Sequence, residues 1–312
     1  MNISHLLYRL LVAALLAVML AACFTGVEST TKITDNDVRR AFREMERGRH
    51  STSLACSVDS LPAWREGKLF WVVDNRVRLI FAPMPDVLID TLNVLGKPLS
   101  YVGYDIHRQI DNTEVVDINF TMGTHKLVYP THRSLADISH PSFSIPFMVD
   151  GDMINYYVRQ VVGKTFFVKT STWYTLQGDK LVGHKFVPVV ITDVKPGNGV
   201  YPMRVEFKTI DNGTSAMLWM TNASASIAGR DFDSQFSAVD VRSLYPNITS
   251  EKWALVMEGK VVIGMTKEEC RLSLGEPNSV AQRPDQMGLR EYWYYDGGRY
   301  LFFVDGLLKD FR

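Results

Sequence analysis

The pattern of hydrophobic and polar positions changes along the chain, and each pattern predicts a different structure. An uncharged apolar run covers residues 10–22 and follows Arg9, which is typical of a secretory signal peptide. Residues 34–48 place apolar side chains three and four positions apart, which predicts one amphipathic helix. Between 61 and 222, apolar residues recur at every second position in short blocks, which predicts β-strands. Residues 248–312 combine two helical patterns with strand patterns.

The end of the apolar run indicates where the mature chain begins. Leu20-Ala21-Ala22 places two small residues directly before Cys23. This sequence resembles the lipobox of bacterial lipoproteins, in which the cysteine thiol receives a diacylglycerol, the chain is cut before it, and the new N-terminus is acylated. The resemblance implies a signal peptide over 1–22 and a lipid anchor at Cys23. An uncleaved transmembrane helix and an ordinary signal peptide are the alternatives.

The residue after Cys23 bears on the membrane that holds the anchor. It is Phe24, whereas an aspartate there suggests inner-membrane retention in enterobacterial lipoproteins, so the resemblance favours the outer membrane. No acidic cluster of the kind that marks surface export follows, which favours the periplasmic face over the cell surface. Residues 23–60 are expected to form a tether and the amphipathic helix, whose arginines face either anionic lipid or solvent.

Two stretches of the middle region read alike and predict an internal repeat. Four blocks recur in the same order, and their length differences fall between the blocks, where loops are expected. The second block aligns Gly96 with Gly183. Each stretch is expected to form a small SH3-like β-barrel of about four to six antiparallel strands. These units cover residues 61–134 and 159–222.

The remaining segments of the middle region are expected to connect the units. Residues 135–158 contain Phe143 and Ile145 among prolines, which predicts a connector that is pinned by hydrophobic side chains to one barrel. Residues 223–247 are expected to be a linker. The predicted fold class is therefore mainly β, with a C-terminal α+β domain after the two repeated units.

Residues 248–312 predict two capped helices followed by a three-stranded antiparallel meander. Thr266 and Glu269 are spaced as a capping box, while Gly275 and Pro277 end the second helix. The three strands are expected around Trp293, after the Gly-Gly turn, and after Gly306. The segment resembles the BamE-like (SmpA/OmlA) domain of bacterial outer-membrane lipoproteins, and the resemblance implies an ααβββ fold. Its motif residues are Gly264, Thr266, Glu269, Gly275, Pro277, Trp293, Tyr295 and Gly306.

The family resemblance also bears on function. Such domains are non-catalytic in that family, and one member is an accessory subunit of the machine that inserts barrel proteins into the outer membrane.

Cys270 stands where an aliphatic residue is expected, and a buried thiol can take that place as a small hydrophobe. Cys56 and Cys270 remain after Cys23 is lipidated, and an exported protein can either join them in a disulfide or keep both thiols free.

Composition excludes several function classes. Lys and Arg total 34 and Asp and Glu total 34, so the net charge is zero and the chain has no electrostatic footprint for nucleic acid. His125, His132, Asp137 and His140 lie close together in sequence, but their spacing matches no familiar metal site. No nucleophile elbow or phosphate-binding loop occurs. The sequence therefore predicts no catalytic residue, no metal ligand, no cofactor and no enzymatic activity.

The sequence favours a non-enzymatic outer-membrane lipoprotein that binds or scaffolds other components of the cell envelope. Outer-membrane assembly components are candidate partners beside the lipid bilayer. Tyr292 and Tyr294 are candidate protein-binding residues, although these aromatics could instead form the core face of the sheet. A peptidoglycan- or glycan-binding module is the first alternative, and it should cluster Trp71, Trp173 and Trp219 at a groove mouth. An envelope enzyme with an unrecognised site is the second.

Overall fold

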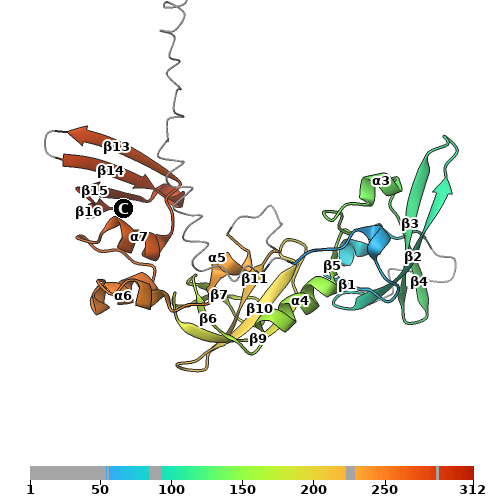
Figure 1. The fold of residues 1–312 in the computed structure, drawn as a ribbon, viewed down its shortest axis with the longest axis horizontal. Helices are drawn as coiled ribbons and strands as arrows, with labels where there is room; N and C mark the ends of the chain where they lie inside the picture. Colours follow the sequence, from blue (N-terminus) through green and yellow to red (C-terminus); the bar gives the residue numbers. More distant parts are fainter. Residues whose placement is uncertain (1–53, 55, 84–92, 223–228, 286–287) are drawn as a thin grey trace, which may run out of the picture. The chain divides into compact units, whose positions relative to one another are not determined.

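The computed structural model describes residue 54 and residues 56–83, 93–222, 229–285 and 288–312. The predicted signal peptide over 1–22, the predicted lipid anchor at Cys23 and the predicted amphipathic helix over 34–48 lie outside the described residues. Within them the protein is mainly β, with three antiparallel sheets, one of which curls into a half-barrel (Figure 1). Each described helix is too short or too polar to cross a lipid bilayer.

The first sheet contains five strands in the order β4-β3-β2-β1-β5. Alternation buries Phe70 and Val72 of β1 and Val116, Ile118 and Phe120 of β3 in one core. The strands are β1 Leu69–Val72, β2 Pro98–Arg108, β3 Glu114–Met122, β4 His125–Pro130 and β5 Met148–Asp150. The connections contain η1 Leu61–Ala63, η2 Asn75–Leu79 and α3 Leu135–Ile138.

The second sheet contains seven strands in the order β12-β6-β9-β10-β11-β7-β8. Residues 159–222 contribute six of these strands, which agrees with the expected four to six, and the seventh, β12, comes from the expected linker 223–247. Helix α4 (Gly151–Val161) places Met153, Tyr157 and Val161 in the core of this sheet. The strands are β6 Thr165–Val168, β7 Thr172–Tyr174, β8 Lys180–Val182, β9 Pro188–Pro196, β10 Met203–Thr209, β11 Ser215–Met220 and β12 Phe236–Ser237, with α5 Phe232–Gln235 before β12.

The two sheets share their strand order and their main hydrogen bonds. The order β4-β3-β2-β1-β5 matches β11-β10-β9-β6-β12 strand for strand. The Tyr101 N–H donates to the Lys68 carbonyl in the first sheet, as the Ile191 N–H donates to the Lys164 carbonyl in the second. A bulge follows Tyr101 and Ile191 at the same place in both pairings. The repeat predicted from the sequence therefore has a counterpart in topology and in backbone contacts.

The sequence alignment of the second block of the repeat is wrong by three residues, because the structural counterpart of Gly96 is Phe186 and not Gly183. The sequence aligned Gly96 with Gly183, but the Gly96 N–H donates to the Val72 carbonyl just as the Phe186 N–H donates to the Val168 carbonyl. Gly96 and Phe186 also share a positive φ, of 71° and 61°. Phenylalanine rarely adopts this conformation, so a glycine was the more obvious match in the sequence.

The strand pairing also differs from the expected closed barrels and simple connectors. Among the described residues, the hydrogen-bonded orders run from β4 to β5 and from β12 to β8 without closing. The expected connector, 135–158, contributes β5 to the first sheet and begins α4. The expected linker, 223–247, contributes β12 to the second sheet. These short strands cover edges of β1 and β6 that would otherwise be exposed.

The third sheet has the order β13-β14-β15-β16, and two helices cover one of its faces (Figure 1). The sequence predicted the helices and the last three strands but took the segment before β14 for a loop. That segment forms an edge strand of the sheet. An edge strand tolerates Pro284, because a proline has no backbone N–H to donate to a neighbouring strand. The elements are η4 Val241–Leu244, α6 Ser250–Met257, α7 Lys267–Leu274, β13 Ser279–Asp285, β14 Gly288–Tyr294, η5 Asp296–Gly298, β15 Tyr300–Val304 and β16 Leu307–Phe311.

Candidate functional site

Alternation along β14 divides its side chains between the two faces of the third sheet. Trp293 is fully buried in the core beneath the helices, while Tyr292 and Tyr294 on either side of it point to the opposite face. Tyr294 is 43% exposed. The sequence left open whether these tyrosines face the core, and the structure places them on the outward face.

The outward face of this sheet carries a group of aromatic side chains. We call this group the aromatic face, and it consists of Tyr292, Tyr294, Tyr300 and Phe302. The strand register places Tyr292 opposite Phe302 and Tyr294 opposite Tyr300. The rings of Tyr292 and Phe302 stack with centroids 4.6 Å apart, and the ring of Tyr294 lies 6.5 Å from Tyr292 at an interplanar angle of 15°. Aromatic side chains, tyrosine among them, are enriched at protein interfaces.

A buried carboxylate supports the aromatic face from below. Glu291 is 3% exposed and accepts hydrogen bonds from the Lys267 ammonium, the Trp293 indole N–H and the Gln282 amide, the last at 3.1 Å. Burial alone would raise the pKa of Glu291, but the hydrogen bonds and the charge of Lys267 lower it below its ordinary value. The ionised carboxylate therefore ties β14 to α7 and β13.

The capping box predicted from the sequence is present at the start of α7. The Thr266 hydroxyl accepts from the Glu269 N–H, and the Glu269 carboxylate accepts from the Thr266 N–H at 2.7 Å. Lys252 on α6 adds an ion pair to Glu269 at 2.8 Å. Thr266 and Glu269 thus begin one helix and hold the other against it, which is a structural role.

The other motif residues make turns and core contacts. Gly264, Gly275 and Gly306 have φ values of 87°, 86° and 81°, which favour glycine. The Tyr295 hydroxyl donates to the Gly275 carbonyl at 3.1 Å, and Pro277 follows the helix end directly. None of these residues joins the aromatic face, so the residues that carry the family resemblance build the fold rather than the surface.

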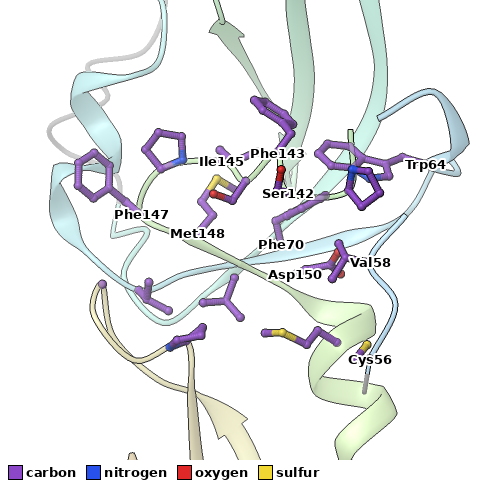
Figure 2. A pocket seen from close by; sticks show the side chains of 18 of the residues that line it. Cys56, Val58, Trp64, Phe70, Ser142, Phe143, Ile145, Phe147, Met148 and Asp150 are labelled. Atoms are coloured by element: carbon purple, nitrogen blue, oxygen red, sulfur yellow. The ribbon is translucent and has the colours of Figure 1, made fainter. Parts of the chain in front are cut away.

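An apolar cavity of about 800 Å³ lies beside β5 (Figure 2). Its walls come from residues 56–58, 141–150 and 198–202, and they include the aromatic rings of Trp64 and Phe70. The volume falls within the usual range of ligand pockets. The sequence did not predict this cavity, because segments far apart in the chain form it. The only signal was the run of hydrophobic residues around the prolines of the expected connector.

Asp150, which lines the cavity, belongs to an ion-pair cluster. The Lys68 ammonium lies 2.9 Å from the Asp150 carboxylate and also pairs with Asp152, while the Lys68 side chain is 4% exposed. Burial alone would lower the pKa of Lys68, but hydrogen bonds and charges from the two aspartates raise it above its ordinary value. Since Lys68 precedes β1 and Asp150 caps α4, this cluster fixes the helix to the first sheet.

The structure does not join the two remaining cysteines in a disulfide. Both are free: Cys56 is half-buried and lines the cavity, while Cys270 is fully buried in the third core. Cys270 packs there as a small hydrophobe.

Alkylation of the native protein at pH 8 is expected to modify Cys56 at least about tenfold faster than Cys270, because a buried group reacts only when the structure opens. Burial raises the pKa of Cys270 to about 12, which keeps it protonated. Mass spectrometry of peptides after timed alkylation measures the two rates, and a denatured sample in which both react equally is the control. Protection of both thiols until a reductant is added would instead reveal a bridge.

The histidine-rich segment forms no cluster. Asp137 belongs to a capping box with Ser134 at the start of α3. In the part of the chain that the structure describes, no three His, Cys, Asp or Glu side chains are placed to hold a metal ion. The His140 ring accepts or donates a hydrogen bond with the Ser142 hydroxyl at 2.7 Å, within a tight turn. Among the described residues no third side chain bonds that ring, so the orienting group of an activated nucleophile is missing.

The described surfaces therefore offer contacts for binding: stacked aromatic side chains on the third sheet and an apolar cavity beside the first. No family model, curated protein or solved structure matches this chain. A function for this chain consequently rests on the sequence motifs and on these two surfaces.

Proposed function

We propose that this chain is a lipid-anchored outer-membrane lipoprotein that acts as a non-enzymatic binding or scaffolding component of the bacterial cell envelope. The lipobox-like sequence before Cys23 supports the anchor. The likeness of residues 248–312 to BamE-like domains supports an envelope role, and we propose two SH3-like units over 61–134 and 159–222 before that domain. Its partners are envelope proteins, with outer-membrane assembly components as candidates, and the periplasmic face is the favoured location.

The aromatic face is the observation that carries the binding role. The helices already cover the opposite face of the sheet, so Tyr292, Tyr294 and Phe302 are not needed to complete the core. Tyr294 is exposed while Tyr292, Tyr300 and Phe302 are half-buried, so the aromatic face is a contiguous and partly exposed apolar patch. Apolar patches on a protein surface mark interaction sites. Tyrosine adds a large contact area with few rotatable bonds and is frequent among residues that dominate binding energy.

The test is crosslinked co-purification of the lipidated protein from membranes, with and without the tyrosines. The Tyr292→Ser, Tyr294→Ser double variant is expected to reduce recovery of the crosslinked partner at least about tenfold, since the residues that dominate an interface, among which tyrosine is frequent, each contribute about 2 kcal/mol or more. Ile110→Ser is the matched control, because Ile110 is a fully exposed apolar residue in the turn between β2 and β3. Its partner yield should equal that of the wild type.

Two outcomes contradict the proposal. Equal recovery of envelope proteins by the double variant would show that the aromatic face is not the binding surface. Recovery of muropeptides in place of proteins would favour the glycan-binding alternative. That alternative lacks its expected site in the described residues, because Trp173 is buried in the second core and none of Trp71, Trp173 and Trp219 lines the cavity.

A further inference from the structure

The turn before β9 joins the second sheet to the helices of the C-terminal domain. The Lys185 N–H donates to the Met257 carbonyl at the end of α6, at 2.8 Å. The Lys185 ammonium donates to the carbonyls of Leu272, at 3.2 Å, and Ser273, both in the last turn of α7. One residue of the second sheet's turn thus bonds the C-terminal ends of both helices.

These carbonyls are suitable partners for a buried ammonium. The last carbonyls of a helix have no donor within the helix, and they carry a partial negative charge. Burial lowers the pKa of Lys185 to about 8, so the side chain remains mostly charged at neutral pH. Lys185 therefore caps α7 from a different part of the chain.

The next residue, Phe186, makes a second contact. Its φ of 61° is unusual for a bulky residue and costs conformational energy. Its ring lies 5.4 Å from the ring of Trp253 on α6 and packs with the core of the C-terminal domain. The backbone of Phe186 thus follows the second sheet while its side chain belongs to the third core.

The first sheet provides an internal comparison for this turn. Gly96 occupies the position of Phe186, with φ of 71° and the equivalent hydrogen bond to the first strand of its sheet. Leu95 occupies the position of Lys185 and is 46% exposed. Glycine adopts this backbone without strain, so the turn itself does not require phenylalanine. The contact of the Phe186 ring with Trp253 therefore accounts for a phenylalanine at this position.

We infer that Lys185 and Phe186 form a latch that docks the C-terminal domain onto the second sheet and couples the opening of one to the other. The contact of Phe186 with Trp253 compensates the strained backbone, and the carbonyls at the end of α7 compensate the buried ammonium. The latch does not depend on the proposed binding role, because none of its residues belongs to the aromatic face.

The experiment is amide hydrogen exchange on the full chain carrying Lys185→Met and Phe186→Gly. Methionine keeps the length of the side chain without its donors, and glycine keeps the backbone conformation without the ring. Amides of α6 and α7 are expected to exchange at least about tenfold faster than in the wild type, while amides of β9 and β10 keep their protection. Leu95→Met in the equivalent turn of the first sheet is the control and should change neither set.

Two outcomes would overturn the proposal of a latch. Unchanged exchange in α6 and α7 would show that other contacts dock the domain. Faster exchange throughout β9 and β10, or loss of folding, would show that the two residues stabilise the second sheet itself.

Discussion

The Glu291→Ala variant is expected to lose about 1–3 kcal/mol of unfolding free energy in residues 248–312, the usual cost of leaving a buried hydrogen-bond donor without its acceptor. The substitution leaves the Lys267 ammonium, the Trp293 N–H and the Gln282 amide without their shared acceptor. The Lys267 side chain is 27% exposed and keeps access to water, but the fully buried Trp293 N–H is left without an acceptor. Urea denaturation, monitored by hydrogen exchange of β14 amides, measures the loss.

An exposed ion pair of the first sheet is the matched control. Arg108 and Glu114 lie 2.9 Å apart with side chains 63% and 58% exposed. Glu114→Ala should therefore cost no more than about 1 kcal/mol, since water screens such a pair. If Glu291→Ala costs as little as Glu114→Ala, the buried network does not hold the domain together.

The same carboxylate predicts sensitivity to acid. The pKa of Glu291 lies below its ordinary value of 4.5 in the folded protein, so the unfolded chain binds this proton more tightly. Its contribution to stability is complete above that ordinary value and is lost as the pH falls through the folded pKa. Glu291→Gln cannot titrate, so the unfolding free energy of that variant should fall less steeply between pH 4.5 and lower values. An identical pH dependence of the unfolding free energy in the wild type and in Glu291→Gln would contradict this expectation.

Local signals predicted the helices and hairpins of the C-terminal domain because neighbouring residues determine them. Thr266 and Glu269 need only each other to cap α7. Asp305 and Gly306 take φ values of 50° and 81°, as a two-residue hairpin requires.

Strands that depend on a distant partner escaped prediction. β5 contains three residues and β12 contains two, too few to show a period of two. They are strands because β1 and β6 offer an edge for pairing. β13 is longer but polar at many positions, and it pairs with one neighbour only. Pairing partners, rather than local propensity, define these elements.

The glycines explain why one block of the repeat was misaligned. Gly183 is a glycine because an added Cβ would lie 2.0 Å from the Trp173 ring. Gly96 is a glycine because the turn has positive φ. The sequence shows the same residue type at both positions and gives no sign that packing requires one and backbone conformation the other.

The candidate surfaces differ in how far the sequence could predict them. Tyr292 and Tyr294 stood out as aromatic residues, but a sheet can be apolar on both faces, and only the position of α6 and α7 identifies the outward one. The cavity needed three segments, 56–58, 141–150 and 198–202, to be brought together. No pattern within one segment contains that information.

Lipidation at residue 23 and cleavage before it are expected to disappear in the Cys23→Ser variant. In the proposed lipoprotein, the Cys23 thiol carries the diacylglycerol and the chain is cut before it. Each buried methylene contributes about 0.8 kcal/mol, so several acyl chains hold the protein on the bilayer almost permanently. Detergent phase partitioning should recover the wild type in the detergent phase, and mass spectrometry should find its N-terminus at an acylated Cys23. A hydroxyl cannot replace the thiol in this modification, so the variant should keep residues 1–22 and carry no lipid.

Cys56→Ser distinguishes lipidation from a general effect of losing a cysteine. Cys56 is half-buried and free, so this substitution should leave partitioning and N-terminal mass unchanged apart from the exchanged atom. The uncleaved apolar run of the Cys23→Ser variant can itself associate with membranes. The mass of the N-terminal peptide therefore decides whether the wild type is held by acyl chains or by this run. A wild-type protein without acyl chains on Cys23 would show that an ordinary signal peptide or a membrane-spanning segment begins the chain. The proposed outer-membrane anchor would then be wrong, whatever the aromatic face binds.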